Sequence, residues 1–245
     1  MPYRRLPTTD QARRRAMAKA LEMGSIKMPG ELAFSQETLE ELRDFSPLFE
    51  KAIANYRSCL EFQVEKNKDY SEIVRKARLY ISHFIQVLNL SIAREEIGSG
   101  AREFYGFGED DSTVPALNLE SEILEWGTKI IDGEQTRMSK GGNPVYSPSI
   151  ALVKVHFSTF QEAHYLQKTL QADTARALEK VALMRETADN LIRNLWNEIE
   201  VHYQYLAPKH KRQKAKDYGI VYIYRRKELR RLNPEDLQTD LVFEM

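Results

Sequence analysis

The chain has 245 residues, of which 42% are hydrophobic and 29% are charged, an ordinary globular composition with enough length for a substantial core. No run approaches the ~20 apolar residues of a membrane span, and the single cysteine, Cys59, excludes a disulfide within the chain. The N-terminus lacks the apolar core of a secretory signal. We therefore expect a cytoplasmic protein without a membrane partner.

The 36 basic and 36 acidic residues cancel, but they are unevenly distributed. Residues 4–19 hold six basic residues and one acidic residue, net +5, and residues 209–231 hold ten basic and two acidic residues, net +8. The stretch between them is net acidic. Such basic runs are typical of solvated helices and tails, or alternatively of segments that contact an acidic partner or nucleic acid.

A short helix is the first predicted element. Thr8 or Thr9 can cap its start and Gly24 can end it, with alanines along one side and Arg13 on the solvated remainder. Ser35 is a good N-cap for the next helix. Pro47 either kinks that second helix or opens a new one at its first position.

Two long stretches, residues 48–97 and 149–207, contain neither glycine nor proline and are 50 and 59 residues long. Their apolar residues recur in alternating steps of three and four, the seam spacing of coiled-coil-like helices. A single 50-residue helix would reach ~75 Å, so we predict a hairpin turn within each stretch. The alternative is two continuous long helices.

The turn in the first stretch is predicted near Asn67, where the apolar pattern lapses. Asn67 can close one helix and Asp69 can cap the next, with Glu72 three residues later completing a capping-box pattern. In the second stretch, a polar gap places the turn near Asp173, which can also act as a cap.

Residues 98–148 form a loop-rich insert between the two stretches, with many glycines in its first part. We expect its aromatic residues to pack against the helices: Phe104, Tyr105 and Phe107. Asn118 is predicted to cap a short helix over residues 119–131. Residues 132–148 return to loop and contain a Gly-Gly-Asn-Pro breaker.

Beyond Pro208, a basic run precedes residues 218–225, which are rich in β-branched and aromatic side chains and therefore predict a strand. A lone strand leaves backbone groups unpaired, so it needs a mate. Residues 241–243 could supply the mate within the chain, and the same strand of a second copy is the alternative.

The basic C-terminal segment is the candidate site for an external contact. Cations release counterions from phosphates, and the interleaved tyrosines can stack on unpaired bases, although no named nucleic-acid motif is present. The candidate contact residues are Lys209, Lys211, Arg212, Lys214, Lys216, Arg225 and Arg226. Alternatively, the same lysines neutralise the acidic helical body.

The segment from Lys209 through Tyr218-Gly219 to Arg225 resembles a feature of uncharacterised helical-bundle proteins of Bacteroidetes-type bacteria. These proteins have a body of paired helices followed by a Tyr-Gly-hydrophobic-Tyr segment. The resemblance is specific over about 15 residues and general over residues 45–206. It implies a helical body and supplies no activity, cofactor or site residue.

No catalytic, cofactor or metal site is predicted. The Glu-x-x-His motif of di-iron bundles is absent, and Glu198 and His202, which share a helix face, supply only two ligands. The chain contains no P-loop, dinucleotide-binding fingerprint or nucleophile elbow. Its carboxylates are expected on solvated helix faces, and Cys59 is expected to fill core space.

Together these elements predict an all-α fold, an up-and-down bundle of four long helices with a short C-terminal β element. Similar apolar spacing in the two halves indicates two duplicated helical hairpins, with chance likeness as the alternative. We expect one globular unit with these parts: residues 1–34, helix and linker; 35–97, first hairpin; 98–148, insert; 149–207, second hairpin; 208–245, basic segment with a strand.

The seam spacing without a catalytic constellation favours a non-enzymatic scaffold or interaction protein, either a homo-oligomer or a binder of a protein partner. The first alternative is a nucleic-acid-associated protein that uses residues 209–231. The second alternative is an enzyme with its site in residues 98–148.

Overall fold

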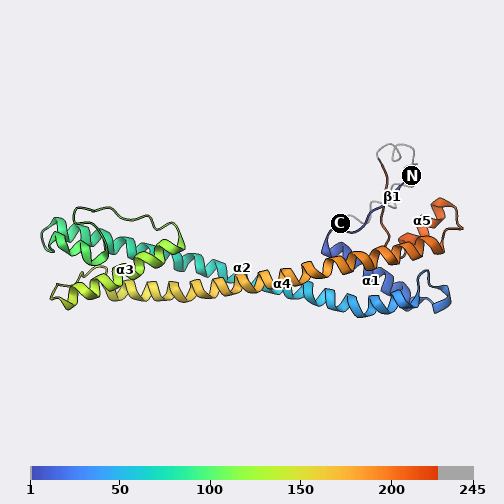
Figure 1. Ribbon diagram of the computed structural model, residues 1–245, viewed down its shortest axis with the longest axis horizontal. Helices are drawn as coiled ribbons and strands as arrows, with labels where there is room; N and C mark the ends of the chain where they lie inside the picture. The colour runs from blue at the N-terminus through green and yellow to red at the C-terminus, as the bar shows by residue number, and fades with distance from the viewer. Residues whose placement is uncertain (1, 226–245) are drawn as a thin grey trace. The chain divides into compact units, whose positions relative to one another are not determined.

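The computed structural model describes residues 2–225, and the all-α prediction is confirmed (Figure 1). The elements in chain order are β1 (Tyr3–Arg4), α1 (Asp10–Ile26), η1 (Pro29–Glu31), α2 (Gln36–Ala93), η2 (Ser99–Tyr105), α3 (Glu120–Ser139), α4 (Ile150–His202), α5 (Pro208–Lys216) and β2 (Tyr222–Ile223). Helices α2 and α4 are far longer than the rest. Within residues 2–225, no helix has the length and apolarity that a membrane span requires.

The chain divides into two compact units, each with its own core. Unit 1 comprises the described residues of Met1–Ser58 and Ala175–Met245, and unit 2 comprises Cys59–Thr174. Each long helix contributes one part to each unit. Unit 1 adds α1, α5 and the β1–β2 pair, whereas unit 2 adds η2 and α3. The order of a short helix followed by a long helix thus occurs twice, first as α1–α2 and then as α3–α4.

The core of unit 1 lies where α1 packs with the first part of α2 and the last part of α4. Apolar side chains recur along each helix at steps of three and four, so they form one buried stripe per helix. The largest fully buried side chains of this core are Met17, Leu42, Phe49, Trp196 and Tyr218.

The core of unit 2 combines the last part of α2 and the first part of α4 with α3 and the insert. Two insert aromatics are buried here as predicted, Tyr105 and Phe107, and Phe104 is partly buried against them. Phe107 stacks on Trp126 of α3 with ring centroids 4.8 Å apart. The insert is therefore fixed to the helices by its aromatic side chains.

The predicted turn near Asn67 is wrong, because α2 continues through this position. The side-chain oxygen of Asn67 accepts a hydrogen bond from Gln167 at 3.2 Å, so a polar pair fills the gap in the apolar stripe. Glu72, the expected capping-box partner, instead pairs with Lys76 at 3.0 Å, an i,i+4 contact that supports a continuous helix.

The predicted turn near Asp173 is wrong as well, because α4 runs unbroken from Ile150 to His202 (Figure 1). Burial continues along α4 at Leu170, Thr174 and Ala177, in steps of four and three. Thr174 is thus buried at a position of the stripe where the sequence has no apolar residue. The four long helices of the predicted bundle are not confirmed, since each long stretch is a single helix.

Two other boundaries differ from the predictions, at Gly24 and at the end of α3, and one alternative left open at Pro47 is decided. Helix α1 passes through Gly24, whose missing Cβ gives room to Leu39, since a Cβ would lie 2.5 Å from the Leu39 Cδ1. Helix α2 contains Pro47 in its interior, so no new helix begins there. Helix α3 extends to Ser139, and its Gly133 lets the Phe104 backbone approach, because a Cβ would lie 2.5 Å from the Phe104 carbonyl oxygen.

Candidate functional site

Most candidate contact residues lie on α5, which the sequence did not predict as a helix. Pro208 lies at its start, where a missing N–H is tolerated, and Ala215 is fully buried in the core of unit 1. The candidate residues on this helix are exposed or half-buried: Lys209, Lys211, Arg212, Lys214 and Lys216. Arg225 follows β2 and is exposed, and Arg226 lies outside the described residues.

Tyr218 and Gly219 attach the C-terminal segment to the N-terminal part of unit 1. Tyr218 is fully buried, and its hydroxyl accepts hydrogen bonds from Lys27 Nζ at 2.9 Å and from the Ala33 N–H at 3.3 Å. Gly219 has a φ of 85°, which favours glycine, and a Cβ there would lie 3.1 Å from the Lys19 Cβ. Tyr218 therefore packs in the core and is not available to stack on a base.

Of the strand predicted over residues 218–225, only Tyr222–Ile223 forms a strand, β2, and its mate is β1 at the other end of the chain. Tyr3 pairs with Ile223 and Arg4 with Tyr222 in an antiparallel ladder. The two mates expected from the sequence were residues 241–243, which lie outside the described residues, and a second copy of the chain. A two-residue strand gives little sequence signal, so the N-terminal mate was missed.

The β1–β2 ladder brings the two basic ends of the chain together in unit 1. We use the name basic surface for the cations of β1, α5 and the residues next to the two strands, together with Lys19 and Lys27, which lie beside Gly219 and Tyr218: Arg4, Arg5, Lys19, Lys27, Lys209, Lys211, Arg212, Lys214, Lys216 and Arg225. Some of these cations have acidic neighbours, since Arg4 lies 3.4 Å from Glu200 and Lys19 lies 2.7 Å from Glu22. Arg5, Lys211 and Lys214 have no ion pair among the residues that the structure describes.

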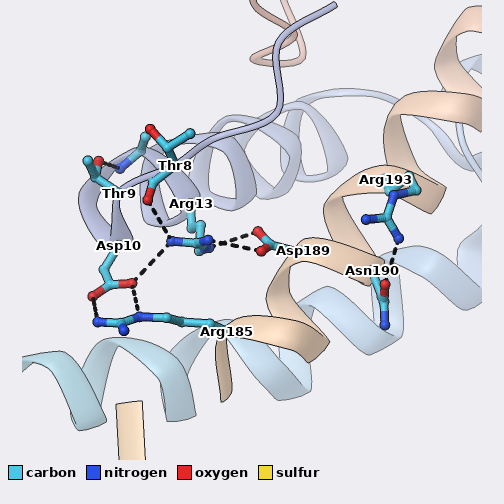
Figure 2. A network of polar contacts seen from close by, with 9 residues as sticks. Thr8, Thr9, Asp10, Arg13, Arg185, Asp189, Asn190 and Arg193 are labelled. Carbon is cyan, nitrogen blue, oxygen red and sulfur yellow. Dashed lines mark hydrogen bonds and ion pairs between the residues drawn. The ribbon is translucent and has the colours of Figure 1, made fainter. Parts of the chain in front are cut away.

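A second polar cluster holds α1 on α4 within unit 1 (Figure 2). The Arg13 guanidinium donates to both carboxylate oxygens of Asp189, at 2.8 and 2.9 Å. The Arg185 guanidinium donates to both oxygens of Asp10, at 2.9 and 2.8 Å. Hydrogen bonds from Arg185 hold the pKa of Asp10 below its ordinary value. Arg13 Nη1 links the two pairs, because it also lies 3.3 Å from Asp10 Oδ1.

The prediction that Arg13 lies on the solvated side of its helix is wrong. Arg13 is only 8% exposed, because its side chain lies between α1 and α4, where it donates hydrogen bonds to Asp189. The two residues are 176 positions apart. No local pattern predicts so distant a pairing, because the half-buried Arg14 and the exposed Arg15 are arginines of the same run.

Unit 2 contains a third polar cluster, and this one is buried. Glu134 is fully buried and Arg137 is 4% exposed. One Glu134 oxygen accepts hydrogen bonds from Arg137 Nη2 at 2.9 Å and from the Val145 N–H at 3.0 Å. The other accepts from Arg137 Nε at 2.8 Å and from the Tyr105 hydroxyl. Burial raises the pKa of Tyr105, and the Glu134 carboxylate raises it further.

This buried cluster joins η2, α3 and the loop that follows α3. Arg137 Nη2 also donates to the Asn143 carbonyl at 2.6 Å, so the loop is bound through both its backbone oxygen and the Val145 N–H. The expectation that carboxylates lie on solvated helix faces is wrong for Glu134. The i,i+3 spacing of Glu134 and Arg137 was a signal, but residues 132–148 had been predicted as loop.

Glu198, His202 and the other histidines do not form a metal centre in the part of the chain that the structure describes, where no three metal-ligating side chains are grouped. The Glu198 carboxylate caps α2, because it accepts from the Ser35 N–H and the Thr38 hydroxyl, both at 2.6 Å. His202 makes an edge contact with the Tyr203 ring.

His164 belongs to a small polar group on the surface of unit 2. Its Nδ1 lies 3.1 Å from the Tyr70 hydroxyl and 3.3 Å from a Glu120 oxygen. Lys168 lies 3.4 Å from the same oxygen. This group links α2, α3 and α4, so it stabilises the packing of unit 2.

Comparison with protein-family models, curated proteins and solved structures finds no match to this chain. The resemblance to helical-bundle proteins of Bacteroidetes-type bacteria therefore stays a prediction. The function of the chain has to be inferred from its own surfaces and clusters.

Proposed function

We propose that this protein is a non-enzymatic binding protein and that the basic surface of unit 1 contacts the phosphate backbone of a nucleic acid. The observation behind the proposal is the β1–β2 pairing, which joins the basic N-terminal segment to the basic C-terminal segment. The pairing brings together parts of two basic runs, residues 4–19 and 209–231, that lie at opposite ends of the sequence. A cytoplasmic location, expected from the sequence, belongs to the same proposal.

The exposed chemistry of the basic surface favours phosphates over bases. Arg5, Lys211 and Lys214 have no ion pair among the described residues, so they are available to replace the counterions of a phosphate backbone. Tyr218 is buried, and the Tyr222 hydroxyl donates to Glu200 at 2.7 Å. With these aromatic groups engaged in packing, we propose binding that depends little on base sequence.

The proposal can be tested by fluorescence anisotropy with a labelled DNA duplex and the full chain. We expect binding at about 50 mM salt that weakens steeply towards about 200 mM, because each phosphate contact releases counterions. Replacing two cations in the variant Lys211→Glu/Lys214→Glu should lower the slope of log K against log salt by about 2.

A matched control is the variant Lys51→Glu/Lys180→Glu. Both lysines are exposed, belong to unit 1 and have no ion pair among the described residues, so the change in net charge is the same. This control should bind nearly as the wild type does. Equal losses in both double variants, or equally tight binding of polyglutamate and DNA, would show a general charge effect and refute the proposal.

Self-association is the second candidate function, and exposed apolar side chains on the long helices favour it. In unit 2, Phe62 and Val64 of α2 are 47% and 55% exposed, and Tyr165 of α4 is 77% exposed. Contacts between copies would cover such side chains. Light scattering over a range of concentrations tests this candidate, with Phe62→Ser/Val64→Ser expected to favour the monomer. A mass that stays monomeric at all concentrations excludes it.

An enzyme with its site in residues 98–148 has weaker support. The buried acid of this region, Glu134, has both oxygens occupied by hydrogen bonds from Arg137, Tyr105 and the Val145 N–H. A general base needs an oxygen or nitrogen that can reach a substrate proton. We therefore assign this cluster to the stability of unit 2.

A further inference from the structure

Unit 2 has an open cavity of about 430 Å³ bounded by η2 and the end of α3. Its volume lies within the range of small-molecule sites. The side chains that line it include Glu96, Ile97, Ala101, Phe104, Arg137 and Lys140. All of them belong to unit 2, so the cavity is independent of the basic surface of unit 1.

Arg137 presents one uncommitted nitrogen to this cavity. Its Nε donates hydrogen bonds to Glu134 and the Tyr105 hydroxyl, and its Nη2 donates to Glu134 and the Asn143 carbonyl. Nη1 makes no hydrogen bond among the described residues, and it is accessible to solvent. Because Arg137 lines the cavity and is otherwise nearly buried, Nη1 is the part of the guanidinium that a ligand can reach.

Gly142 keeps the approach to this nitrogen open. A Cβ at position 142 would lie 2.7 Å from Arg137 Nη1, so any larger residue would displace the guanidinium or cover it. The buried Glu134 and Tyr105 hold the other side of the guanidinium in place. The donor is therefore fixed in direction before a ligand arrives, which lowers the entropic cost of binding.

Lys140 adds a second cation to the cavity wall. Its ammonium lies 4.8 Å from the centroid of the Phe104 ring, and both residues line the cavity. Lys140 has no ion pair among the residues that the structure describes. One part of the wall thus offers two cationic donors beside an aromatic ring.

The remaining wall decides which anion fits. Ile97 and Ala101 are apolar, so a purely inorganic ion would leave them without a partner. Glu96 adds a negative charge, and Arg94, its neighbour, lies 4.0 Å away. A dianion would be repelled by Glu96 more than a monoanion would. A carboxylate with an apolar body matches both parts of the wall.

We propose that this cavity binds a small carboxylate, with its head group on Arg137 Nη1 and Lys140 and its apolar body against Ile97, Ala101 and Phe104. The site combines a nearly buried guanidinium that has one uncommitted nitrogen, a glycine that keeps this nitrogen accessible, and an apolar part of the wall.

The test uses hexanoate as the probe and its neutral isostere hexanamide as the comparison, with the full chain in ligand-observed NMR titrations. We expect saturable binding of hexanoate and about tenfold weaker binding of hexanamide, because a charged acceptor forms stronger hydrogen bonds with the two cations. Inorganic phosphate should bind more weakly than hexanoate.

Three variants sharpen the test. Lys140→Gln should weaken hexanoate roughly threefold, and Gly142→Ala should weaken it more by obstructing Nη1. The matched control is Lys129→Gln, which removes a lysine of α3 that lies 4.6 Å from the Trp126 ring and outside the cavity lining. This control should leave hexanoate binding unchanged. If the circular dichroism spectrum of Gly142→Ala shows that this variant does not fold, the test rests on the comparison of Lys140→Gln with Lys129→Gln.

Several outcomes overturn the proposal. The absence of saturable hexanoate binding would remove the site. Equal affinities for hexanoate and hexanamide would show that the cations do not act on the ligand. Tighter binding of phosphate than of hexanoate would refute the carboxylate assignment, and equal effects of Lys140→Gln and Lys129→Gln would place the probe elsewhere.

Discussion

Units 1 and 2 have a similar arrangement of helices, but their arginine–carboxylate pairs differ in position and burial. In each, a short helix packs with parts of α2 and α4, and an arginine of that helix forms a two-nitrogen contact with a carboxylate. In unit 1 the partner of Arg13 is Asp189 on α4, whose side chain is 30% exposed. In unit 2 the partner of Arg137 is Glu134, one turn earlier on the same helix and fully buried. The first pair joins two helices, whereas the second fixes a loop.

This difference in exposure determines what each pair contributes to stability. Partly exposed ion pairs remain hydrated, so each contributes about 0–1 kcal/mol. A buried pair that loses one partner leaves an uncompensated charge, and this costs about 3–5 kcal/mol. We therefore expect equivalent substitutions to have much larger effects in unit 2 than in unit 1.

The two tryptophans allow the units to be followed separately. Trp196 is buried in the core of unit 1, and Trp126 packs against the core of unit 2. The variant Trp126→Phe leaves Trp196 to report on unit 1, and Trp196→Phe leaves Trp126 to report on unit 2. Fluorescence during urea unfolding then yields the stability of each unit.

The largest expected effect comes from Arg137→Leu in the chain that retains Trp126. The free energy of unfolding reported by unit 2 should fall by about 3–5 kcal/mol, because Glu134 loses two donors while remaining buried. Adding Glu134→Leu should recover much of the loss, since the unpaired charge is removed.

The control for this prediction is Lys129→Leu. Lys129 pairs with Glu125 at 2.6 Å on the same helix, but both side chains are exposed, so the change should be at most about 1 kcal/mol. Similar losses for Arg137→Leu and Lys129→Leu would contradict the assigned role of burial.

The next effect concerns glycines at close helix contacts. Gly133→Ala in unit 2 should cost about 1–3 kcal/mol, because the added Cβ would lie 2.5 Å from the Phe104 carbonyl oxygen, a backbone atom that cannot easily move. Gly24→Ala in unit 1 meets only the end of the Leu39 side chain, which can adopt another rotamer. This second change should be near neutral, because alanine also favours the helix by about 1 kcal/mol. A larger loss for Gly24→Ala than for Gly133→Ala would contradict the argument.

The same glycines show what the sequence could and could not predict. Helix-breaking composition was a fair guide to the insert, but Gly24 and Gly133 lie inside helices because partners distant in sequence need the space of a Cβ. The N-caps Thr9 and Ser35 were predicted correctly, because capping is a local interaction between a side chain and the next turn. The all-α class followed from apolar spacing, which is local as well.

The predicted turns at Asn67 and Asp173 failed for a related reason. Polar residues in an apolar stripe indicate a break only when no polar partner faces them, and Gln167 lies opposite Asn67. The candidate clusters were missed because their partners are remote, as with Arg13 and Asp189, or because the helix itself was predicted to end early, as at Glu134. The composition of the C-terminal segment identified its basic residues, but it did not predict that β2 in this segment pairs with β1.

A smaller effect separates the N-caps of the two short helices. Thr9 Oγ1 accepts a hydrogen bond from the Ala12 N–H at 3.2 Å, whereas in α3 the Glu122 carboxylate accepts from the Asn118 and Leu119 N–H groups. Thr9→Ala should therefore lower the stability of unit 1 by about 1 kcal/mol. The control Leu119→Ala should leave unit 2 nearly unchanged, since this exposed side chain makes no capping bond. A comparable loss in both would contradict the assignment of the caps.

The smallest effect is a pH dependence confined to unit 1. Hydrogen bonds from Arg185 hold the pKa of Asp10 below its ordinary value of 3.8, so the folded state binds fewer protons there than the unfolded state. The stabilisation is complete above pH 3.8 and is lost as the pH falls through the lowered pKa of the folded state. In Asp10→Asn this carboxyl is absent. The loss of stability of unit 1 below pH 3.8, followed by Trp196 fluorescence, should therefore be smaller than in the wild type, by at most about 1 kcal/mol. Asp44→Asn, at an exposed acid of unit 1, is the control and should keep the wild-type slope. Parallel acid profiles of the wild type and Asp10→Asn would show that the pair in Figure 2 does not stabilise unit 1 through this carboxylate.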